Sequence, residues 1–248
     1  MPSADTVKVL SSRQIAGGIH RLTVSYMQTV LPGQFFMLQS ENSGVLLPRP
    51  ISICDHTSGE LVFLVQTVGK GTNELANLRE GDSLHLTGPL GNGFPVDSLS
   101  GRVALVSGGV GIAPMLLTAR ALHAKGIEAD CLCGFADEPY LIGELAEFAQ
   151  ELHVATETGR VGVQGFVTKL LEPSRYSAVL CCGPTPMMKA VTALCQAEGT
   201  PVYVSLETRM ACGIGACLVC TCTDKNGKNR RTCKDGPVFR GEEINFDA

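Results

Sequence analysis

Residues 209–222 read RMACGIGACLVCTC and hold four of the eleven cysteines of the chain. Three of them are spaced as Cys212-x4-Cys217-x2-Cys220, and a further cysteine, Cys233, follows. The order C-x4-C-x2-C…C is that of plant-type [2Fe–2S] sites, in which four thiolates bind two irons. The spacing therefore predicts a [2Fe–2S] cluster held by these four cysteines.

The residues between the cysteines suit a loop that wraps around inorganic sulfide. Gly213 and Gly215 permit positive φ angles and a close approach of the backbone, so that backbone N–H groups can donate to the cluster sulfurs. Cys222 lies two residues after Cys220, and a ligand set that used it would lose the x2 step. We therefore expect Cys222 to be a bystander.

A structural zinc site is the alternative interpretation of the cysteines. Zinc sites usually contain paired C-x2–4-C knuckles, and here only Cys217 and Cys220 form such a pair. The spacing favours the iron–sulfur cluster. Visible absorption distinguishes the two, since Zn²⁺ is d¹⁰.

The rest of the chain predicts a mixed β and α/β fold. Residues 1–98 contain short alternating segments broken by Gly, Pro, Asn and Asp, for example HRLTVSY and ELVFLVQTV, which indicate a small antiparallel β-barrel. In residues 99–206, apolar strand patterns alternate with helix patterns, which indicates a Rossmann-like parallel sheet. From residue 207 this pattern ends, so residues 207–248 are predicted to form a small cysteine-rich domain.

Two glycine turns in the parallel-sheet part are candidates for nucleotide binding. SGGVGIAP (residues 107–114) follows an apolar strand and opens a helix, where a backbone free of side chains can approach a pyrophosphate. CCGP (residues 181–184) ends another strand at the edge where ligands bind in open α/β sheets. Each could equally be an ordinary tight turn.

Two stretches of the barrel part are candidates for phosphate binding. Arg49, in RPISI, could pair with a phosphate through two hydrogen bonds, or it could be an ordinary surface arginine. Gly71 and Thr72 precede a helix-like NELANL segment, whose N-terminus could bind a phosphate or could simply be capped.

Composition excludes several classes of protein. The net charge is −4 and no long basic run is present, which argues against nucleic-acid binding. No apolar run approaches the roughly 20 residues of a membrane span, and the N-terminus does not resemble a signal peptide. With 44% hydrophobic residues in 248, the chain can bury more than one core. We expect a soluble cytoplasmic protein with reduced cysteines.

The ordered motifs RPIS, GPLGNGF, GGVGIAP, CGP, ETRMACGIGAC and CKDGPVF closely resemble those of the electron-transfer subunits of class 1B dihydroorotate dehydrogenase. That family belongs to the ferredoxin–NADP reductase superfamily. The resemblance covers essentially the whole chain. It implies an FAD-binding barrel, an NAD-binding Rossmann-like domain and a C-terminal [2Fe–2S] domain.

The resemblance also implies roles for individual residues. In the barrel they would hold the flavin and its phosphates, although the family often carries a Tyr-Arg pair where this chain has Leu-Val-Gln. In the second part they would contact the pyridine nucleotide. The implied FAD residues are Arg49, Pro50, Ile51, Ser52, Leu64, Val65, Gln66, Gly71 and Thr72, and the implied NAD residues are Gly108, Gly109, Gly111, Ile112, Cys182 and Gly183.

The implied activity is electron transfer to NAD⁺ as co-substrate. In this family a partner subunit carries FMN and oxidises dihydroorotate, and two copies of each chain assemble. Electrons would pass from FMN through the cluster and FAD, so we expect no catalytic acid or base in this chain. Asp137 and Glu138 follow the second strand of the Rossmann-like part, with no basic residue in that segment. Because relatives specific for NADP offer Ser, Arg or Lys there, we expect a preference for NAD(H).

Two other functions fit parts of the pattern. Small subunits of NADH-dependent ferredoxin–NADP reductase or of sulfide dehydrogenase share the three parts, but some of them carry Asp at the position of Cys212. A non-enzymatic binding module stabilised by zinc is the alternative from another class, and a flavin spectrum would distinguish it.

Overall fold

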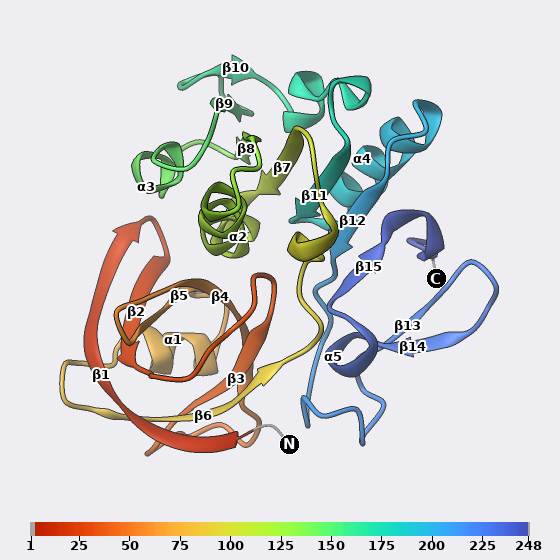
Figure 1. The fold of residues 1–248 in the computed structure, drawn as a ribbon. Helices are drawn as coiled ribbons and strands as arrows, with labels where there is room; N and C mark the ends of the chain where they lie inside the picture. Colours follow the sequence, from red (N-terminus) through yellow and green to blue (C-terminus); the bar gives the residue numbers. More distant parts are fainter. Residues whose placement is uncertain (1–2, 248) are drawn as a thin grey trace.

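The N-terminal part of the chain forms a closed antiparallel barrel in this computed structural model, which describes residues 3–247 (Figure 1). The strands neighbour one another in the order β1-β2-β5-β4-β3-β6. Alternate residues of a strand face opposite sides, and inward-facing Leu22, Phe36 and Phe63 are fully buried. The elements are β1 (Ser3–Ala16), β2 (Ile19–Ser25), β3 (Phe35–Ser40), β4 (Arg49–Thr57), β5 (Glu60–Gln66), α1 (Lys70–Ala76) and β6 (Ser83–Leu90).

This barrel confirms the antiparallel barrel predicted from the alternating segments. The sequence analysis did not single out β1, a strand of 14 residues. β1 pairs with β6 over its first residues and with β2 over the rest, and its register shifts between Val9 and Ser11. The strand thereby joins both edges of the sheet and closes it.

A mainly parallel seven-stranded sheet forms the second part, in the order β10-β9-β8-β7-β11-β12-β15. Its first six strands are parallel, which confirms the predicted Rossmann-like sheet. The elements are β7 (Val103–Gly108), α2 (Ala113–Ala124), β8 (Ala129–Phe135), α3 (Ile142–Ala146), β9 (Glu151–Thr156), β10 (Val163–Gln164), β11 (Ala178–Cys182), α4 (Thr185–Ala197) and β12 (Val202–Ser205).

Both faces of this sheet are buried, as the continuous apolar strands require. On one face Leu105 of β7 packs with Leu116 of α2. On the other face Val106 packs with Met188 and Val191 of α4. Figure 1 shows α2 between the sheet and the barrel. The helix therefore serves both parts of the molecule.

Helix α3 is shorter than its sequence pattern predicts. YLIGELAEFAQ favoured a helix over residues 140–150, but the helix ends at Ala146. The ring of Phe148 instead lies under the Arg120 guanidinium, 4.5 Å from it, and beside His123 of α2. Packing against α2 thus replaces the last helical turn.

No helix within residues 3–247 is long and apolar enough to cross a membrane.

The cysteine-rich tail is joined to the parallel sheet rather than separate from it. Its last strand pairs antiparallel with β12, so that Val204 lies opposite Phe239. The described tail contains the hairpin β13 (Thr221–Thr223) and β14 (Asn229–Arg231), helix α5 (Thr232–Asp235) and β15 (Val238–Arg240). Short 3₁₀ helices lie at Val96–Ser98, Gly109–Ile112, Val167–Leu170, Pro173–Arg175 and Gly241–Glu243.

The barrel and the parallel sheet are fastened to each other by shared packing and two ion pairs. Arg21 of β2 lies 2.6 Å from Glu144 of α3. Arg120 of α2 donates two hydrogen bonds to Asp55 of β4, at 2.7 and 3.0 Å. Apolar side chains of the barrel and of α2 belong to one buried cluster. The barrel and the parallel sheet are therefore held in one arrangement relative to each other.

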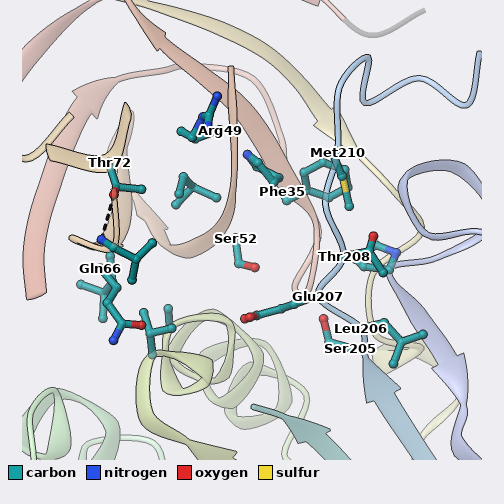
Figure 2. A pocket seen from close by; sticks show the side chains of 17 residues that line it. Phe35, Arg49, Ser52, Gln66, Thr72, Ser205, Leu206, Glu207, Thr208 and Met210 are labelled. Atoms are coloured by element: carbon teal, nitrogen blue, oxygen red, sulfur yellow. Dashed lines mark hydrogen bonds between the residues drawn. The ribbon is translucent and has the colours of Figure 1, made fainter. Parts of the chain in front are cut away.

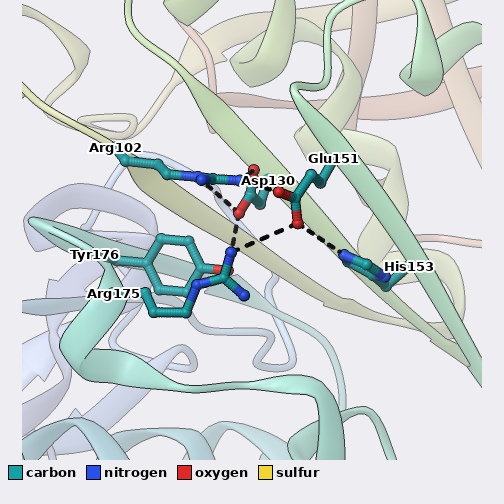
Figure 3. A network of polar contacts seen from close by, with 6 residues as sticks. All are labelled: Arg102, Asp130, Glu151, His153, Arg175 and Tyr176. Atoms are coloured by element: carbon teal, nitrogen blue, oxygen red, sulfur yellow. Dashed lines mark hydrogen bonds and ion pairs between the residues drawn. The ribbon is translucent and has the colours of Figure 1, made fainter.

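A polar network ties the amino ends of the parallel strands together (Figure 3). Asp130 is fully buried in β8 and accepts two hydrogen bonds from Arg102, at 2.9 and 3.0 Å, and one from the Tyr176 hydroxyl at 2.9 Å. Arg102 also pairs with Glu151 at the start of β9. Hydrogen bonding from Arg102 and then His153 lowers the pKa of Glu151 to about 2. The network joins β7, β8 and β9 at the edge opposite their carboxyl ends.

Asp130→Asn should destabilise the protein by about 2 kcal/mol, because the amide replaces one buried acceptor oxygen with an NH₂ group that faces the donors of Arg102 or Tyr176. Urea unfolding of the cofactor-free chain measures this. Tyr176→Phe is the matched control and should cost about 1 kcal/mol, since it removes one neutral donor. Equal stability of Asp130→Asn and the unmodified protein would contradict the assigned role.

Candidate functional site

The four predicted ligand cysteines lie in two pairs. Within the first pair, the backbone N–H of Cys217 donates to the Cys212 sulfur at 3.4 Å. Within the second, the sulfurs of Cys220 and Cys233 are 3.1 Å apart. Across residues 3–247, no three His, Cys, Asp or Glu side chains surround a single point suited to one metal ion. The paired arrangement suits a two-iron cluster in which each iron takes two protein thiolates.

The two pairs differ in burial. Cys220 and Cys233 are each 2% exposed, whereas Cys212 is half-buried and Cys217 is exposed. We call Cys220 and Cys233 the inner pair and Cys212 and Cys217 the outer pair. The cluster site therefore has a buried side and a surface side.

The electrostatics of both pairs favour bound metal. Burial alone would raise the pKa of Cys212, but backbone N–H groups of Cys217 and Ile214 donate to its sulfur and lower the pKa to about 6. Burial, and then the adjacent Cys220 sulfur, raises the pKa of Cys233 to about 12. Two thiolates this close repel each other, and a bound cation removes that repulsion. The residues present thus fit a [2Fe–2S] cluster.

Glycines are required in the loop of the outer pair. Gly213 has φ +70°, and a Cβ there would lie 2.7 Å from Met37 Cγ. Gly215 has φ +81°, and a Cβ there would lie 2.8 Å from Lys234 Cδ. Any side chain at either position would push the loop off the barrel or off α5. Cys222 belongs to neither pair and packs, partly buried, against the core around Phe239, as expected for a bystander.

A cavity of about 290 Å³ lies between the barrel, α2 and the segment after β12 (Figure 2). Two buried polar atoms at this cavity, Arg49 Nε and Thr208 Oγ1, have no hydrogen-bond partner. Unpaired buried donors are costly, so this wall is built for a polar ligand such as a phosphate-bearing cofactor. The cavity is lined by Phe35, Arg49, Pro50, Ile51, Ser52, Leu64, Gln66, Val68, Thr72, Val110, Ala113, Ser205, Leu206, Glu207, Thr208, Met210 and Pro237.

Most of the predicted FAD residues line this cavity, with two exceptions. Val65 points into the barrel core, where it is fully buried beside Phe63. Gly71 is not part of the lining, but a Cβ there would lie 3.1 Å from Arg49 Nε, so glycine leaves room for that side chain. The Thr72 hydroxyl accepts the N–H groups of Val68 and Gly69 and caps α1. It shapes the wall of the cavity.

A second cavity, of about 510 Å³, lies at the carboxyl ends of the parallel strands. Gly108, Gly109, Gly111 and Gly183, four of the six residues that the resemblance assigns to the nucleotide, line it. The other two predicted residues, Ile112 and Cys182, are buried behind the wall. A Cβ on residue 111 would collide with the carbonyl of Cys182, so only glycine fits at this position.

An apolar hollow of about 590 Å³ continues this cavity and shares Gly108, Gly109 and Phe135 with it. Phe166 and Glu157 also line this hollow. Together the two spaces form an extended groove along the edge where ligands bind in open α/β sheets. The groove has room for a dinucleotide.

The first two cavities meet at Gln66, Val110 and Glu207, which line both. The Glu207 carboxylate points toward Ser52 in Figure 2. The residue is exposed, but partial desolvation by the surrounding protein raises the pKa of its carboxyl group. Sequence analysis did not identify Glu207 as a site residue. Its position directly after the last parallel strand was the available signal.

One wall separates the first cavity from the inner cysteine pair. Phe35 and Met210 line the cavity. The same two side chains pack in an apolar cluster that contains Cys220 and Cys233, together with Met37. A ligand in the cavity and a cluster on the inner pair would therefore be neighbours.

The surroundings of Asp137 differ from the sequence-based expectation. Asp137 and Glu138 line the second cavity, but a basic residue, Arg160, lies beside them. Its Nη1 is 3.3 Å from Asp137 Oδ2, and Thr158 donates to the other carboxylate oxygen at 2.7 Å. The turn after β9 supplies Arg160, which lies outside the 134–148 segment on which the expectation was based. That segment has no basic residue, but the fold brings one beside it from elsewhere in the chain.

Comparison with known proteins gives consistent matches. Residues 207–245 match the family model of the iron–sulfur cluster binding domain of dihydroorotate dehydrogenase B. A Clostridium perfringens protein named dihydroorotate dehydrogenase B (NAD(+)), electron transfer subunit, is 47% identical over 96% of this chain and 97% of its own. A Listeria monocytogenes protein of the same name is 38% identical over 96% of this chain and 97% of its own.

Solved structures agree with the fold. The structure of an NADH-dependent reduced ferredoxin–NADP oxidoreductase, studied for flavin-based electron bifurcation, has a TM-score of 0.87. It is 32% identical and covers 97% of this chain and 90% of that one. A ferredoxin reductase of carbazole 1,9a-dioxygenase superposes with a TM-score of 0.69 at 20% identity, over 82% of this chain and 69% of that one. The latter likeness concerns the fold alone.

Replacing Cys212, Cys217, Cys220 or Cys233 with Ser should reduce iron from about two per chain to well under one, because each change removes a terminal thiolate. Cys222→Ser is the matched control and should retain its iron. Iron and acid-labile sulfide assays on purified variants measure the effect. A Cys222 variant that loses iron while a Cys220 variant keeps it would refute the ligand assignment.

The protein should prefer NADH to NADPH. Carboxylates line the groove and would repel a 2′-phosphate, and Arg160 is already paired with Asp137. Asp137→Ser should free Arg160 to meet a 2′-phosphate and raise kcat/KM for NADPH about tenfold, or about 1.4 kcal/mol. Steady-state reduction of an artificial acceptor measures both nucleotides. Asp137→Ser combined with Arg160→Ala is the control and should lose the gain. Equal kcat/KM for the two nucleotides in the unmodified protein would contradict the preference.

Proposed function

Because the chain belongs to the family of electron transfer subunits of dihydroorotate dehydrogenase B, we propose that it connects the FMN of a dihydroorotate-oxidising catalytic subunit to NAD⁺. The chain is an oxidoreductase subunit that uses a [2Fe–2S] cluster and FAD, with NAD⁺ as co-substrate. The carbon substrate is bound by the partner.

One observation carries this proposal: the candidate sites are contiguous. The inner cysteine pair shares Phe35 and Met210 with the first cavity. That cavity in turn shares Gln66, Val110 and Glu207 with the second. This order corresponds to cluster, flavin and nicotinamide. A flavin in the middle position supplies the needed chemistry, because it exchanges single electrons with a cluster and a hydride with nicotinamide.

The residues of this chain would bind and orient the carriers and exclude water. Arg49, with its unpaired buried Nε, would hold a flavin phosphate. The backbone at Gly108, Gly109 and Gly111 would approach the nucleotide pyrophosphate. No acid or base of the chain is required for hydride transfer, so we assign no catalytic residue.

The partner would cover the outer cysteine pair. Ile214, Leu218 and Val219 are 50%, 61% and 53% exposed around it. Apolar side chains concentrated at one exposed site are typical of the centre of a protein interface. By resemblance to the family, we propose two copies of each subunit in the complex. The cytoplasmic location remains a prediction, as do the part boundaries after residues 98 and 206.

A second candidate function is supported by the ferredoxin–NADP oxidoreductase structure, which has a TM-score of 0.87 at 32% identity. That identity is lower than the 47% shared with the Clostridium perfringens protein. Cys212, where some members of the alternative group carry Asp, also favours the dihydroorotate system. A ferredoxin-dependent assay separates the two candidates.

Co-expression with a catalytic subunit of dihydroorotate dehydrogenase B should yield a complex that reduces NAD⁺ with dihydroorotate. The chain alone should keep NADH–dye activity but should aggregate or lose its cluster, because its apolar loop is uncovered. Size-exclusion chromatography and the two assays measure these outcomes. Leu218→Asp should prevent assembly, and Leu10→Asp, at an exposed leucine on β1, is the matched control.

A chain that stays monomeric with its cluster and ignores the catalytic subunit would refute the proposed partner. Activity only with ferredoxin and both nucleotides would support the second candidate instead.

A further inference from the structure

Arg231 links the two segments that carry the ligand cysteines. Its Nη1 donates to the carbonyl of Gly215, in the loop of the outer pair, at 3.4 Å. Its backbone N–H, Nε and Nη2 donate to the carboxylate of Asp235 at 2.7, 3.3 and 3.2 Å. Asp235 ends α5, the helix that contains Cys233. The guanidinium is therefore held in one position beside the cluster site.

The peptide that Arg231 contacts is itself part of the cluster site. The carbonyl of Gly215 and the N–H of Ala216 belong to the same peptide group. This peptide lies in the loop between Cys212 and Cys217, where the N–H of Cys217 donates to the Cys212 sulfur at 3.4 Å. A cation on the carbonyl polarises the peptide. Arg231 thus polarises a peptide of the loop that carries the outer pair.

Arg231 also lies within electrostatic reach of the inner pair. Arg231 precedes Cys233 by two residues, and Asp235, which accepts hydrogen bonds from its guanidinium, follows Cys233 by two residues. Reduction adds negative charge to an iron–sulfur cluster. Nearby positive charge and hydrogen bonds to sulfur favour the reduced state, and nearby negative charge disfavours it.

We infer that Arg231 and Asp235 set the reduction potential of the bound cluster in opposite directions, with Arg231 raising it through the Gly215 peptide and Asp235 restraining that effect. The inference rests on the proposed cluster. It concerns positioning residues, since neither side chain is a ligand. A purely structural clamp would behave differently, because loss of either partner would then loosen the same loop and have the same effect.

The test is a potentiometric titration of the cluster, monitored by EPR, in the chain assembled with its catalytic subunit. Arg231→Gln should lower the potential, because the cation is lost and the Asp235 carboxylate remains. Asp235→Asn should raise it, because the guanidinium is no longer neutralised. The double variant should fall between them. Arg240→Gln is the matched control, because Arg240 pairs with Glu242 and lies over the ring of Tyr203, and its removal should leave the potential unchanged.

Iron content is measured on the same samples. Opposite shifts at full iron content support the inference. If Arg231→Gln loses iron, Arg231→Lys is tested in its place, because lysine keeps the charge. The cluster of Arg231→Lys should then have a higher reduction potential than that of the double variant. Shifts of the same sign, an unchanged potential in Asp235→Asn, or loss of iron from both Arg231→Lys and Asp235→Asn would overturn the inference. Absence of a cluster from the unmodified protein in its complex with the catalytic subunit would instead refute the proposed function.

Discussion

The pairing of β15 with β12 is the constraint on which the arrangement of the sites depends. It brings the cysteine-rich tail back to the parallel sheet after the loop and helix α5, which carry the proposed ligands. Asn92, in the connection between barrel and sheet, reinforces it: its side chain donates to the carbonyl of Val238 at 2.9 Å and accepts the Val238 N–H at 3.2 Å. Its backbone N–H donates to Gly236. Asn92 therefore ties the end of the barrel part to the tail strand that pairs with β12, and the tail can hold its inner cysteines against the wall of the barrel.

How far the sequence predicts this protein depends on how local each feature is. The four cysteines could be proposed as ligands from the sequence because three of them lie within nine consecutive positions, 212–220, in the order typical of plant-type [2Fe–2S] sites. Alternating apolar and polar residues likewise predicted the barrel, and strand patterns that alternate with helix patterns predicted the parallel sheet. The wall made by Phe35 and Met210, and the approach of Arg160 to Asp137, join residues that are distant in sequence. No local pattern encodes such contacts, so they required the structure.

The predicted flavin and nucleotide residues show the same limit at finer scale. Leu64 and Gln66 line the first cavity and Val65 does not, because alternate residues of β5 face opposite sides. A motif identifies the segment that meets a ligand, whereas the period of the strand selects which of its side chains do so. Cys182 gives a related case: its carbonyl, packed against Gly111, supports the turn from behind. Residues of a motif can thus be essential for shape without touching the ligand.

The gradient of burial across the cysteines gives the chain a direction. The outer pair is open to solvent beside apolar side chains, and the inner pair is enclosed with Met37 and Phe35. Because electron transfer needs close approach, a protein partner can reach the cluster from the outer side, whereas a ligand in the first cavity meets it from the inner side. The same asymmetry separates two requirements. The outer side must be accessible so that a partner can dock there, whereas the flavin and the nucleotide on the inner side must be shielded from water. The loop of the outer pair meets both requirements. Gly213 and Gly215 let it pack closely against the barrel and α5, so that one side of the site is exposed and the other is buried.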